Sequence, residues 1–417
     1  MAVPAVALAV ALAASACAAP DTAGGDPAGD SATASAELAV SVGLDPGWAL
    51  EPLPSPAGYS SASPELTVEA GRAIVSWLDM SGGSVTLRFA ERRATGWSEA
   101  GAVVSGEELV VNAADVPSVL ALADGTLVAH WLQEDGSDPE AYALPLAWSR
   151  DGGRVWSDPI YPHHDGRQVQ HGFASLFEAP NGGLGLVWLD GRETGGGLDG
   201  GMNLWGATYD VDGTQLSETV IDTRVCDCCS LSTARTSDGI VAVYRDRTDD
   251  EIRDTSIVRF VDGVWSPPAT VHHDGWRIQG CPVNGPAVSA RGQEVVVAWF
   301  TAAGDVGRAY VAFSRDGGRT FAPAIRVDDE ASLGDVDVEL LADGSAAVTW
   351  VELAAERRSQ LRRIGPDGAR SRAITVADMS DSWAPVLARA GDELLLAWRQ
   401  RSTNGSSRIQ TARVALD

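Results

Sequence analysis

Residues Ser149–Trp156 read SRDGGRVW, and the same pattern returns at Ser314–Phe321 as SRDGGRTF. Each residue type in Ser-x-Asp-x-Gly-x-x-aromatic suits a tight turn between two strands. The Asp carboxylate can accept backbone N–H bonds inside the turn, and Gly adopts a positive φ that other residues avoid. The aromatic ring then leaves the turn and packs inward. Two copies of so constrained a pattern predict a repeated all-β fold.

Working outward from these turns, short apolar strands that end in an aromatic residue recur along the chain. Their last residues are Trp77, Trp131, Trp188, Tyr244, Trp299, Trp350 and Trp398, with spacings of 54, 57, 56, 55, 51 and 48. A period near 50 built from strands and turns is typical of a β-propeller with one blade per period. Seven such strands predict one propeller of seven four-stranded blades, with six as the alternative. The ring-facing strand of each blade is expected just before these strands.

The last blade lacks an outer strand, because the chain ends after the strand expected near Arg408–Val414. Gly47–Leu50 reads GWAL and resembles two predicted outer strands, at Gly96–Glu99 (GWSE) and Val264–Pro267 (VWSP). We therefore expect N-terminal residues near Trp48 to complete the last blade and remove an open sheet edge.

The two SRDGG turns resemble the Asp-box of the sialidase (BNR-repeat) β-propellers, a structural turn away from the active face. The cysteine-rich stretch Val225–Cys229 with Cys281–Pro286 is similar to a secreted bacterial subgroup of sialidase-like proteins. The resemblance implies a propeller over residues 41–417 and exo-sialidase-type action on carboxylated sugars. Sialidases have six blades, and their Arg-Ile-Pro motif and tyrosine nucleophile are not found here.

Composition restricts the partners. The formal net charge is −26, which argues against nucleic acid or an anionic membrane surface. All 31 basic residues are Arg, so lysine-based chemistry is excluded.

The first residues predict export. Residues 1–17 are small and apolar and end in Ala14-Ser15-Ala16-Cys17, similar to a lipoprotein signal with Cys17 as the lipidated residue. An ordinary signal peptide with cleavage nearby is the alternative. Residues 18–40 are rich in Ala, Gly, Ser, Asp and Pro and predict a disordered tether. We expect a bacterial cell-surface or periplasmic protein that meets the membrane only through a lipid anchor.

Unusual residues occupy the loops that enter the first strand of successive blades and should converge at the channel mouth. They include Asn112, Asp115, His171, Cys226, Cys228, Cys229, Cys281, Asn284, Asp335 and Asp337. In an oxidising compartment the four cysteines predict disulfides. As thiolates, together with His171, they predict a copper or zinc site. Both interpretations remain open at this level.

The loops that leave the second strand lie on the same predicted face. They hold Asp190, Arg192, Arg245, Asp246 and Arg399. Sialidases bind the substrate carboxylate with three arginines, so the resemblance makes Arg192, Arg245 and Arg399 candidates for that cluster, beside the carboxylates of Asp190 and Asp246. Solvated loop salt bridges are the structural alternative. Trp276 and Trp383 are candidate sugar platforms.

Three functions are compatible with these patterns. The first is a sialidase-like glycoside hydrolase, and the second is a metal-binding propeller with a Cys/His site. The third is a non-catalytic module that binds glycans or proteins. In each case the expected ligand is a glycan, a small molecule or an ion at the channel mouth.

Overall fold

A computed structural model describes residue 44 and residues 47–138, 140–194, 201–378, 385–402 and 405–416. The chain divides into a unit Met1–Leu38 and a unit Ala39–Asp417, and the description that follows concerns the second unit. Within the described residues, no helix is both long enough and apolar enough to cross a membrane. Cys17 and Trp383 lie outside the described residues.

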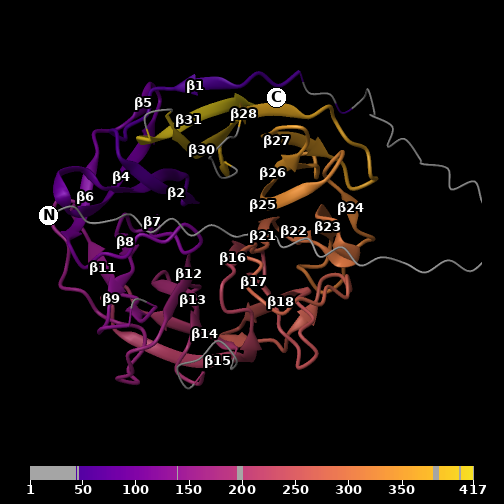
Figure 1. The fold of residues 1–417 in the computed structure, drawn as a ribbon. Coiled ribbons are helices and arrows are strands. Elements are labelled where there is room, and N and C mark those ends of the chain that lie inside the picture. The colour runs from indigo at the N-terminus through magenta and orange to yellow at the C-terminus, as the bar shows by residue number, and fades with distance from the viewer. Residues whose placement is uncertain are drawn as a thin grey trace, which may run out of the picture. The chain divides into compact units, whose positions relative to one another are not determined.

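The described strands form seven blades around one axis, which confirms the predicted all-β propeller (Figure 1). The first four blades use β2 (Ser61–Glu69), β3 (Arg72–Asp79), β4 (Val85–Arg93), β5 (Gly96–Trp97) and β6 (Gly101–Gly106); then β7 (Ser118–Ala121), β8 (Leu127–His130), β9 (Gln133–Glu134), β10 (Tyr142–Ala143) and β11 (Leu146–Ser149); then β12 (His171–Glu178), β13 (Leu184–Asp190), β14 (Met202–Tyr209) and β15 (Gln215–Val225); then β16 (Ser232–Arg235), β17 (Gly239–Arg245), β18 (Thr255–Val261), β19 (Val264–Trp265) and β20 (Ala269–Thr270).

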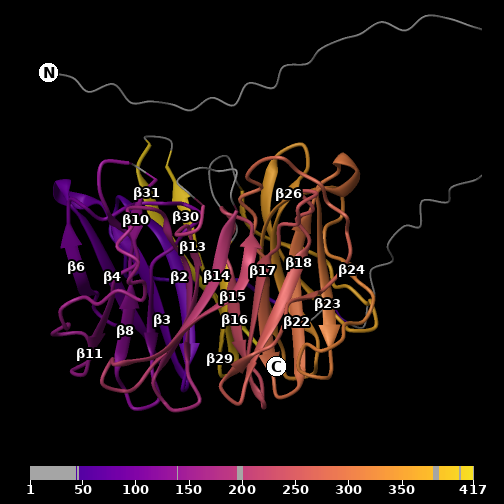
Figure 2. The same cartoon turned by 90° about the horizontal axis from the view of Figure 1, so that it is seen from below.

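The last three blades follow the same plan, and their strands run between the two faces of the ring (Figure 2). They use β21 (Ala287–Arg291), β22 (Glu294–Thr301), β23 (Arg308–Ser314) and β24 (Ile325–Arg326); then β25 (Ser332–Leu340), β26 (Ala346–Leu353), β27 (Arg357–Ile364) and β28 (Ile374–Asp378); then β29 (Val386–Ala390), β30 (Glu393–Arg401), β31 (Ser407–Ala415) and β1 (Glu51–Leu53). Short 3-10 turns occur at η2 (Ser81–Gly83) and η3 (Ala303–Asp305).

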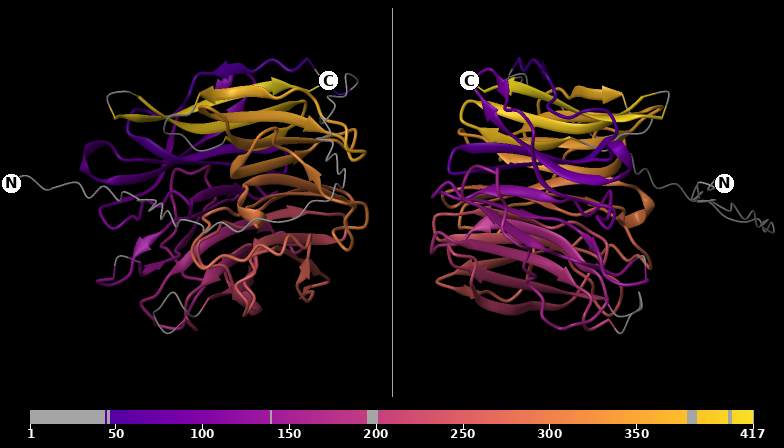
Figure 3. Two further views of the ribbon diagram at one scale, coloured as in Figure 1. Left: turned by 45° about the vertical axis from the view of Figure 1, so that its right-hand side comes forward. Right: turned by 90° about the vertical axis from the view of Figure 1, so that its left-hand side faces the viewer.

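An N-terminal strand closes the ring, as the sequence predicted. β1 pairs antiparallel with β31, with Leu53 opposite Thr411, so the first and last parts of the propeller lie side by side (Figure 3). The strand lies at Glu51–Leu53 rather than at Trp48. Trp48 is half-buried just before it and packs on the core cluster of the last blade. The short strand leaves the edge of β31 covered, which removes an aggregation-prone edge.

The aromatic residue near the end of each second strand is a core residue. Trp77, Trp131, Trp188, Tyr244, Trp299, Trp350 and Trp398 are all buried. Side chains of a strand alternate between the two faces of its sheet, and in a propeller those faces pack against the neighbouring blades. The repeated aromatic positions therefore fill the interfaces between blades.

The two SRDGG turns have the predicted internal bonding. The Asp316 Oδ1 atom accepts hydrogen bonds from the Ser314 hydroxyl at 2.7 Å and from the backbone N–H groups of Arg319 and Thr320 at 3.0 and 2.9 Å. These donors outweigh the effect of burial and lower the pKa of Asp316 to about 2. Gly317 and Gly318 take φ values of 68° and 77°. The turn follows β23, the third strand of its blade, on the face opposite the blade entries.

Candidate functional site

The innermost strands of the blades surround an axial cavity of about 280 Å³. Every blade contributes to its wall. One lining residue from each blade, in chain order, is Glu65, Asp115, Ser175, Ser232, Ala287, Asp337 and Arg399. Because residues from all seven blades meet here, this cavity is the place where the blades can act on one ligand.

A recurring backbone irregularity shapes the mouth of the cavity. Ser63, Phe173, Val283 and Asp335 line it in four different blades, and their φ values are 52°, 52°, 50° and 49°. In three of these blades the pairing of the first two strands shifts register at this point. Such bulges re-aim side chains, and non-glycine residues with positive φ concentrate at functional sites. The strain is repeated where the blades meet the axis.

Carboxyl groups dominate the chemistry of the cavity. Burial, with a further contribution from the charge of Asp337, raises the pKa of Glu65 to about 8. Burial also raises the pKa values of Asp115, Asp335 and Asp337 to about 7. The Tyr142 hydroxyl donates to Asp115 Oδ2 at 2.9 Å, whereas the buried Asp115 Oδ1 has no hydrogen-bond partner among the described residues. The cavity can therefore both donate and accept protons near neutral pH.

Of the three arginines predicted to bind a carboxylate, Arg399 lines the cavity and Arg192 does not. The Arg192 guanidinium donates to Asp190 Oδ2 at 2.7 Å and to Glu218 Oε1 at 2.9 Å, and it lies 3.8 Å from the centre of the Trp205 ring. Asp190 is fully buried and also accepts a bond from Trp188 Nε1 at 2.8 Å. Burial opposes ionisation of Asp190, but the bonds from Arg192 outweigh it and lower the pKa. This pair joins the strands of one blade.

Arg245 also has a different position from the one predicted. It is 1% exposed, and its three nitrogens donate to the backbone oxygens of Asn284, Arg253 and Phe300 at 2.8, 2.6 and 2.8 Å. Its guanidinium lies over the ring of Trp276, which is itself buried and so cannot serve as the predicted sugar platform. Three of the five N–H donors of Arg245 are thus engaged by backbone oxygens, and Arg245 does not line the axial cavity.

Asp246 is likewise occupied within its own blade. Its Oδ2 accepts a bond from the Ser256 hydroxyl at 2.9 Å, and its Oδ1 accepts one from the backbone N–H of Arg247 at 2.7 Å. Asp190, Arg192, Arg245 and Asp246 therefore do not converge on the axis. These four side chains are held by partners within or between the blades, whereas Arg399, near the end of β30, lines the cavity.

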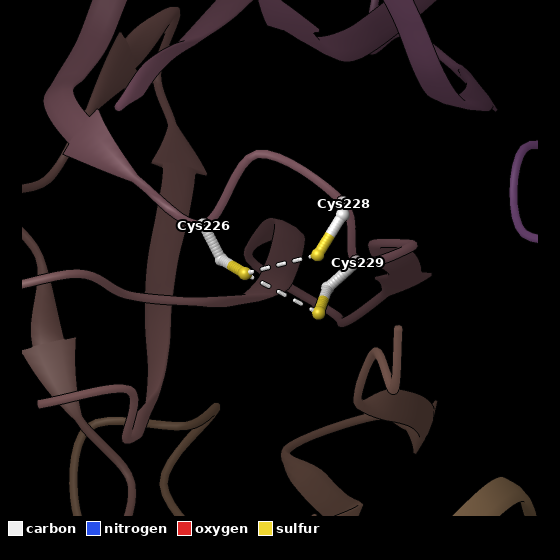
Figure 4. Close-up of side chains that lie close together, drawn as sticks. All are labelled: Cys226, Cys228 and Cys229. Carbon is white, nitrogen blue, oxygen red and sulfur yellow. Dashed lines mark hydrogen bonds between the residues drawn. The ribbon is translucent and has the colours of Figure 1, made fainter. Parts of the chain in front are cut away.

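The cysteines do come together, beside the cavity wall formed by Ser230 and Leu231. Between β15 and β16 the chain bends, and Cys226 Sγ lies 3.8 Å from Cys228 Sγ and 3.4 Å from Cys229 Sγ (Figure 4). The four cysteines of the described chain form no disulfide. Hydrogen bonds with Cys228 and Cys229, helped by the charge of Arg253, hold the pKa of the Cys226 thiol well below its usual range.

His171 does not join the cysteines. It is fully buried at the start of β12 and stacks on His163, with ring centroids 3.7 Å apart. Its Nε2 lies 3.3 Å from Asp165 Oδ1 and 3.7 Å from Asp190 Oδ1. Burial, and then the charge of His171, lower the pKa of His163 to about 4. The predicted mixed Cys/His site is therefore two separate clusters, because each blade entry turns toward its own blade.

Glu65 and Glu339 are absent from the candidates chosen on sequence. Glu65 lines the cavity, and Glu339 lies on β25 two residues beyond Asp337. An available signal was the alternation of Asp335, Asp337 and Glu339 with apolar residues, which places the three acidic side chains on one face of an innermost strand.

Comparisons with known proteins show that the fold resembles those of solved structures, without a match in sequence. No protein-family model matches the chain, and no curated protein matches its sequence. The BP39L lectin from Burkholderia pseudomallei superimposes with a TM-score of 0.61 at 12% identity, over 86% of this chain and 97% of that chain. A protein of unknown function from Dyadobacter fermentans has a TM-score of 0.51 at 14% identity, over 88% and 98%. The NanB sialidase from Streptococcus pneumoniae has a TM-score of 0.47 at 10% identity, over 85% of each chain. The fold is thus one that a solved lectin structure shares.

Proposed function

We propose that this chain is a sialidase-like propeller that acts on a glycan bound in the axial cavity. The observation that carries the proposal is the convergence of Glu65, Asp115, Asp337 and Arg399 on one cavity at the axis. Sugars are recognised by groups that both donate and accept hydrogen bonds, which carboxyl groups with pKa values near 7 can do. The lectin structure that shares the fold supports this class of ligand.

The carboxyl groups also suit glycoside hydrolysis, which needs one protonated acid and one ionised carboxylate around the scissile bond. Glu65 has the higher pKa, about 8, and is our candidate for the acid. Asp337 is the partner whose charge contributes to that pKa, and its own value is about 7. A pair whose protonation states differ near neutral pH can divide the two roles.

The cavity favours a neutral sugar over the carboxylated sugar that the family resemblance implies. A sialic-acid carboxylate needs several cationic partners, and Arg192 and Arg245 are engaged by Asp190, Glu218 and backbone oxygens. In the described cavity wall Arg399 stands among carboxyl groups. A negatively charged ligand would therefore meet repulsion from the ionised fraction of Glu65 and Asp337.

A panel of neutral and sialylated aryl glycosides, together with a glycan array, tests the proposal. Wild-type protein should hydrolyse or bind at least one neutral glycan, and Glu65→Gln and Asp337→Asn should lower turnover by about 100-fold or more. The matched control is Glu69→Gln, on the same strand β2, where Glu69 pairs with Arg235 at 3.4 Å and does not line the cavity.

The outcomes separate the remaining interpretations. Glycan binding without turnover identifies a lectin-type module, with Glu65 and Asp337 as binding residues. If the protein hydrolyses sialosides and Arg399 is required for it, the substrate is a carboxylated sugar and not a neutral one. Neither binding nor turnover across both panels overturns the proposal.

We also propose that the protein is exported and anchored through Cys17, on the basis of the N-terminal sequence. Mass spectrometry of the membrane fraction should find an N-terminal peptide that begins at a diacylglyceryl-modified Cys17. Cys17→Ser should move the protein to the soluble fraction. An unmodified N-terminus at another position would identify ordinary signal cleavage instead.

A further inference from the structure

We propose that Cys226, Cys228 and Cys229 form a thiolate site for a soft metal ion, copper(I) or zinc(II), beside the axial cavity. This site is independent of glycan action. The arrangement of the sulfurs, the donors that surround them and the position of a fourth cysteine support it. His171, which the sequence grouped with these residues, takes no part in it.

The sulfur spacing fits a shared ion. The Cys226 sulfur lies 3.8 and 3.4 Å from the sulfurs of Cys228 and Cys229, and the three sulfurs lie within 4.8 Å of one another. A tetrahedral ion with Zn–S bonds of about 2.3 Å holds its sulfurs about 3.8 Å apart. A disulfide would bring two of them to about 2.05 Å. The side chains point toward one another from a bent segment, which an extended strand could not achieve (Figure 4).

The groups around the sulfurs stabilise negative charge on them. Arg253, which is 1% exposed, donates from Nη1 to Cys226 Sγ at 3.0 Å and from Nη2 to Glu251 Oε2 at 2.8 Å. On the other side, the backbone N–H of Asn284 donates to Cys229 Sγ at 3.4 Å. A neutral thiol is a weak acceptor, so a buried guanidinium and an amide aimed at two sulfurs indicate thiolates. Such donors tune and orient the ligands of metal sites.

A fourth cysteine is placed to distinguish the two ions. Cys281 is exposed on the loop before β21, and its sulfur lies within 4.8 Å of the sulfur of Cys228 and of a carboxylate oxygen of Asp227. Structural zinc takes four ligands, so it would use the Cys281 thiolate. Copper(I) is a softer ion that thiolates select, and three sulfurs can complete its coordination.

Competition titrations of the reduced full chain test the proposal, with bicinchoninate as the competitor for copper(I) and pyridylazoresorcinol for zinc(II). One equivalent of one ion should bind, and iodoacetamide should modify fewer than four of these thiols until a chelator is added. Cys226→Ser and Cys229→Ser should each weaken binding by at least about 100-fold, since outer partners alone are worth about 10- to 100-fold. Cys281→Ser should weaken zinc binding similarly but leave copper(I) binding within a few-fold.

Arg253→Gln tests the surrounding donors and should weaken binding by about 10-fold or more. Its matched control is Arg277→Gln, because Arg277 pairs with Asp250 on the surface at 3.4 Å and does not contact a sulfur. Should a cysteine variant fail to fold, alkylation and intact mass of the wild type still decide. Cysteines that react only after reduction, with no metal bound before or after, identify disulfides and overturn the proposal. Four freely reactive thiols with no measurable binding of either ion also overturn it.

Discussion

Arg245→Ala should lower the free energy of unfolding by about 4 kcal/mol, because buried carbonyls left without donors cost about 1–3 kcal/mol each. The guanidinium is buried and satisfies three backbone oxygens, from Asn284, Arg253 and Phe300. Two of these oxygens belong to Arg253 and Asn284, which also donate hydrogen bonds to the sulfurs of the cysteine cluster. Urea denaturation followed by tryptophan fluorescence measures the change.

Arg277→Ala is the matched control, since its side chain is 66% exposed and should change stability by less than about 0.5 kcal/mol. The Arg245 prediction distinguishes the two roles considered for this residue. If Arg245→Ala keeps wild-type stability yet loses affinity for carboxylated sugars, Arg245 binds ligand and the carbonyl contacts are incidental.

Stability should fall as the pH rises from about 5 to about 9, because carboxyl groups at the axis must ionise inside the fold. The pKa of Glu65 is raised from 4.5 to about 8, and those of Asp115, Asp335, Asp337 and Glu339 are raised to about 7. The folded state holds these protons more tightly than the unfolded chain. Their stabilisation is therefore complete below the unfolded pKa values near 4 and is lost as the pH passes through 7 to 8.

Glu65→Gln should remove part of this slope and raise the free energy of unfolding at pH 8 by on the order of 3 kcal/mol, at about 1.4 kcal/mol per pKa unit. Glu91→Gln is a control of opposite sign, because hydrogen bonds from Arg72 lower the pKa of Glu91. That variant should lose stability at neutral pH and match the wild type once Glu91 is protonated at low pH. Urea midpoints at constant ionic strength, measured across this range, would show both. A wild-type curve that stays flat from pH 5 to 9 would contradict the prediction.

Much of the architecture could be predicted from local patterns. The SRDGG turns, the aromatic residue near every fiftieth position and the sequence around Trp48 predicted blades, blade number and ring closure. These signals work because each depends on a few neighbouring residues: a turn needs glycine with positive φ, and a blade interface needs a large apolar ring at one strand position. The same periodicity placed Asp115, Asp337 and Arg399 on the face where the cavity lies.

The direction of each side chain needed the tertiary structure. Arg192, Arg245 and Arg399 all lie near the end of the second strand of their blades, yet the first two pack between or within blades and the third lines the cavity. Their position in the repeat predicts at which end of the blade they lie. It does not predict which group the long, flexible guanidinium will bind. Glu218 and three backbone oxygens are such partners, and they come from segments distant in sequence.

Local patterns were enough to predict a repeated all-β chain with an acidic charge, closed by its own N-terminal strand, and to place four cysteines at two neighbouring blade entries. The packing of the blades was needed to show that three sulfurs meet without a disulfide, that His171 belongs to a different cluster, and that the cavity at the axis is rich in carboxyl groups. The reason is physical. Turns and periodicity are set by short-range sterics and burial, whereas a site is set by the register and bulges that bring different blades to within a few ångströms.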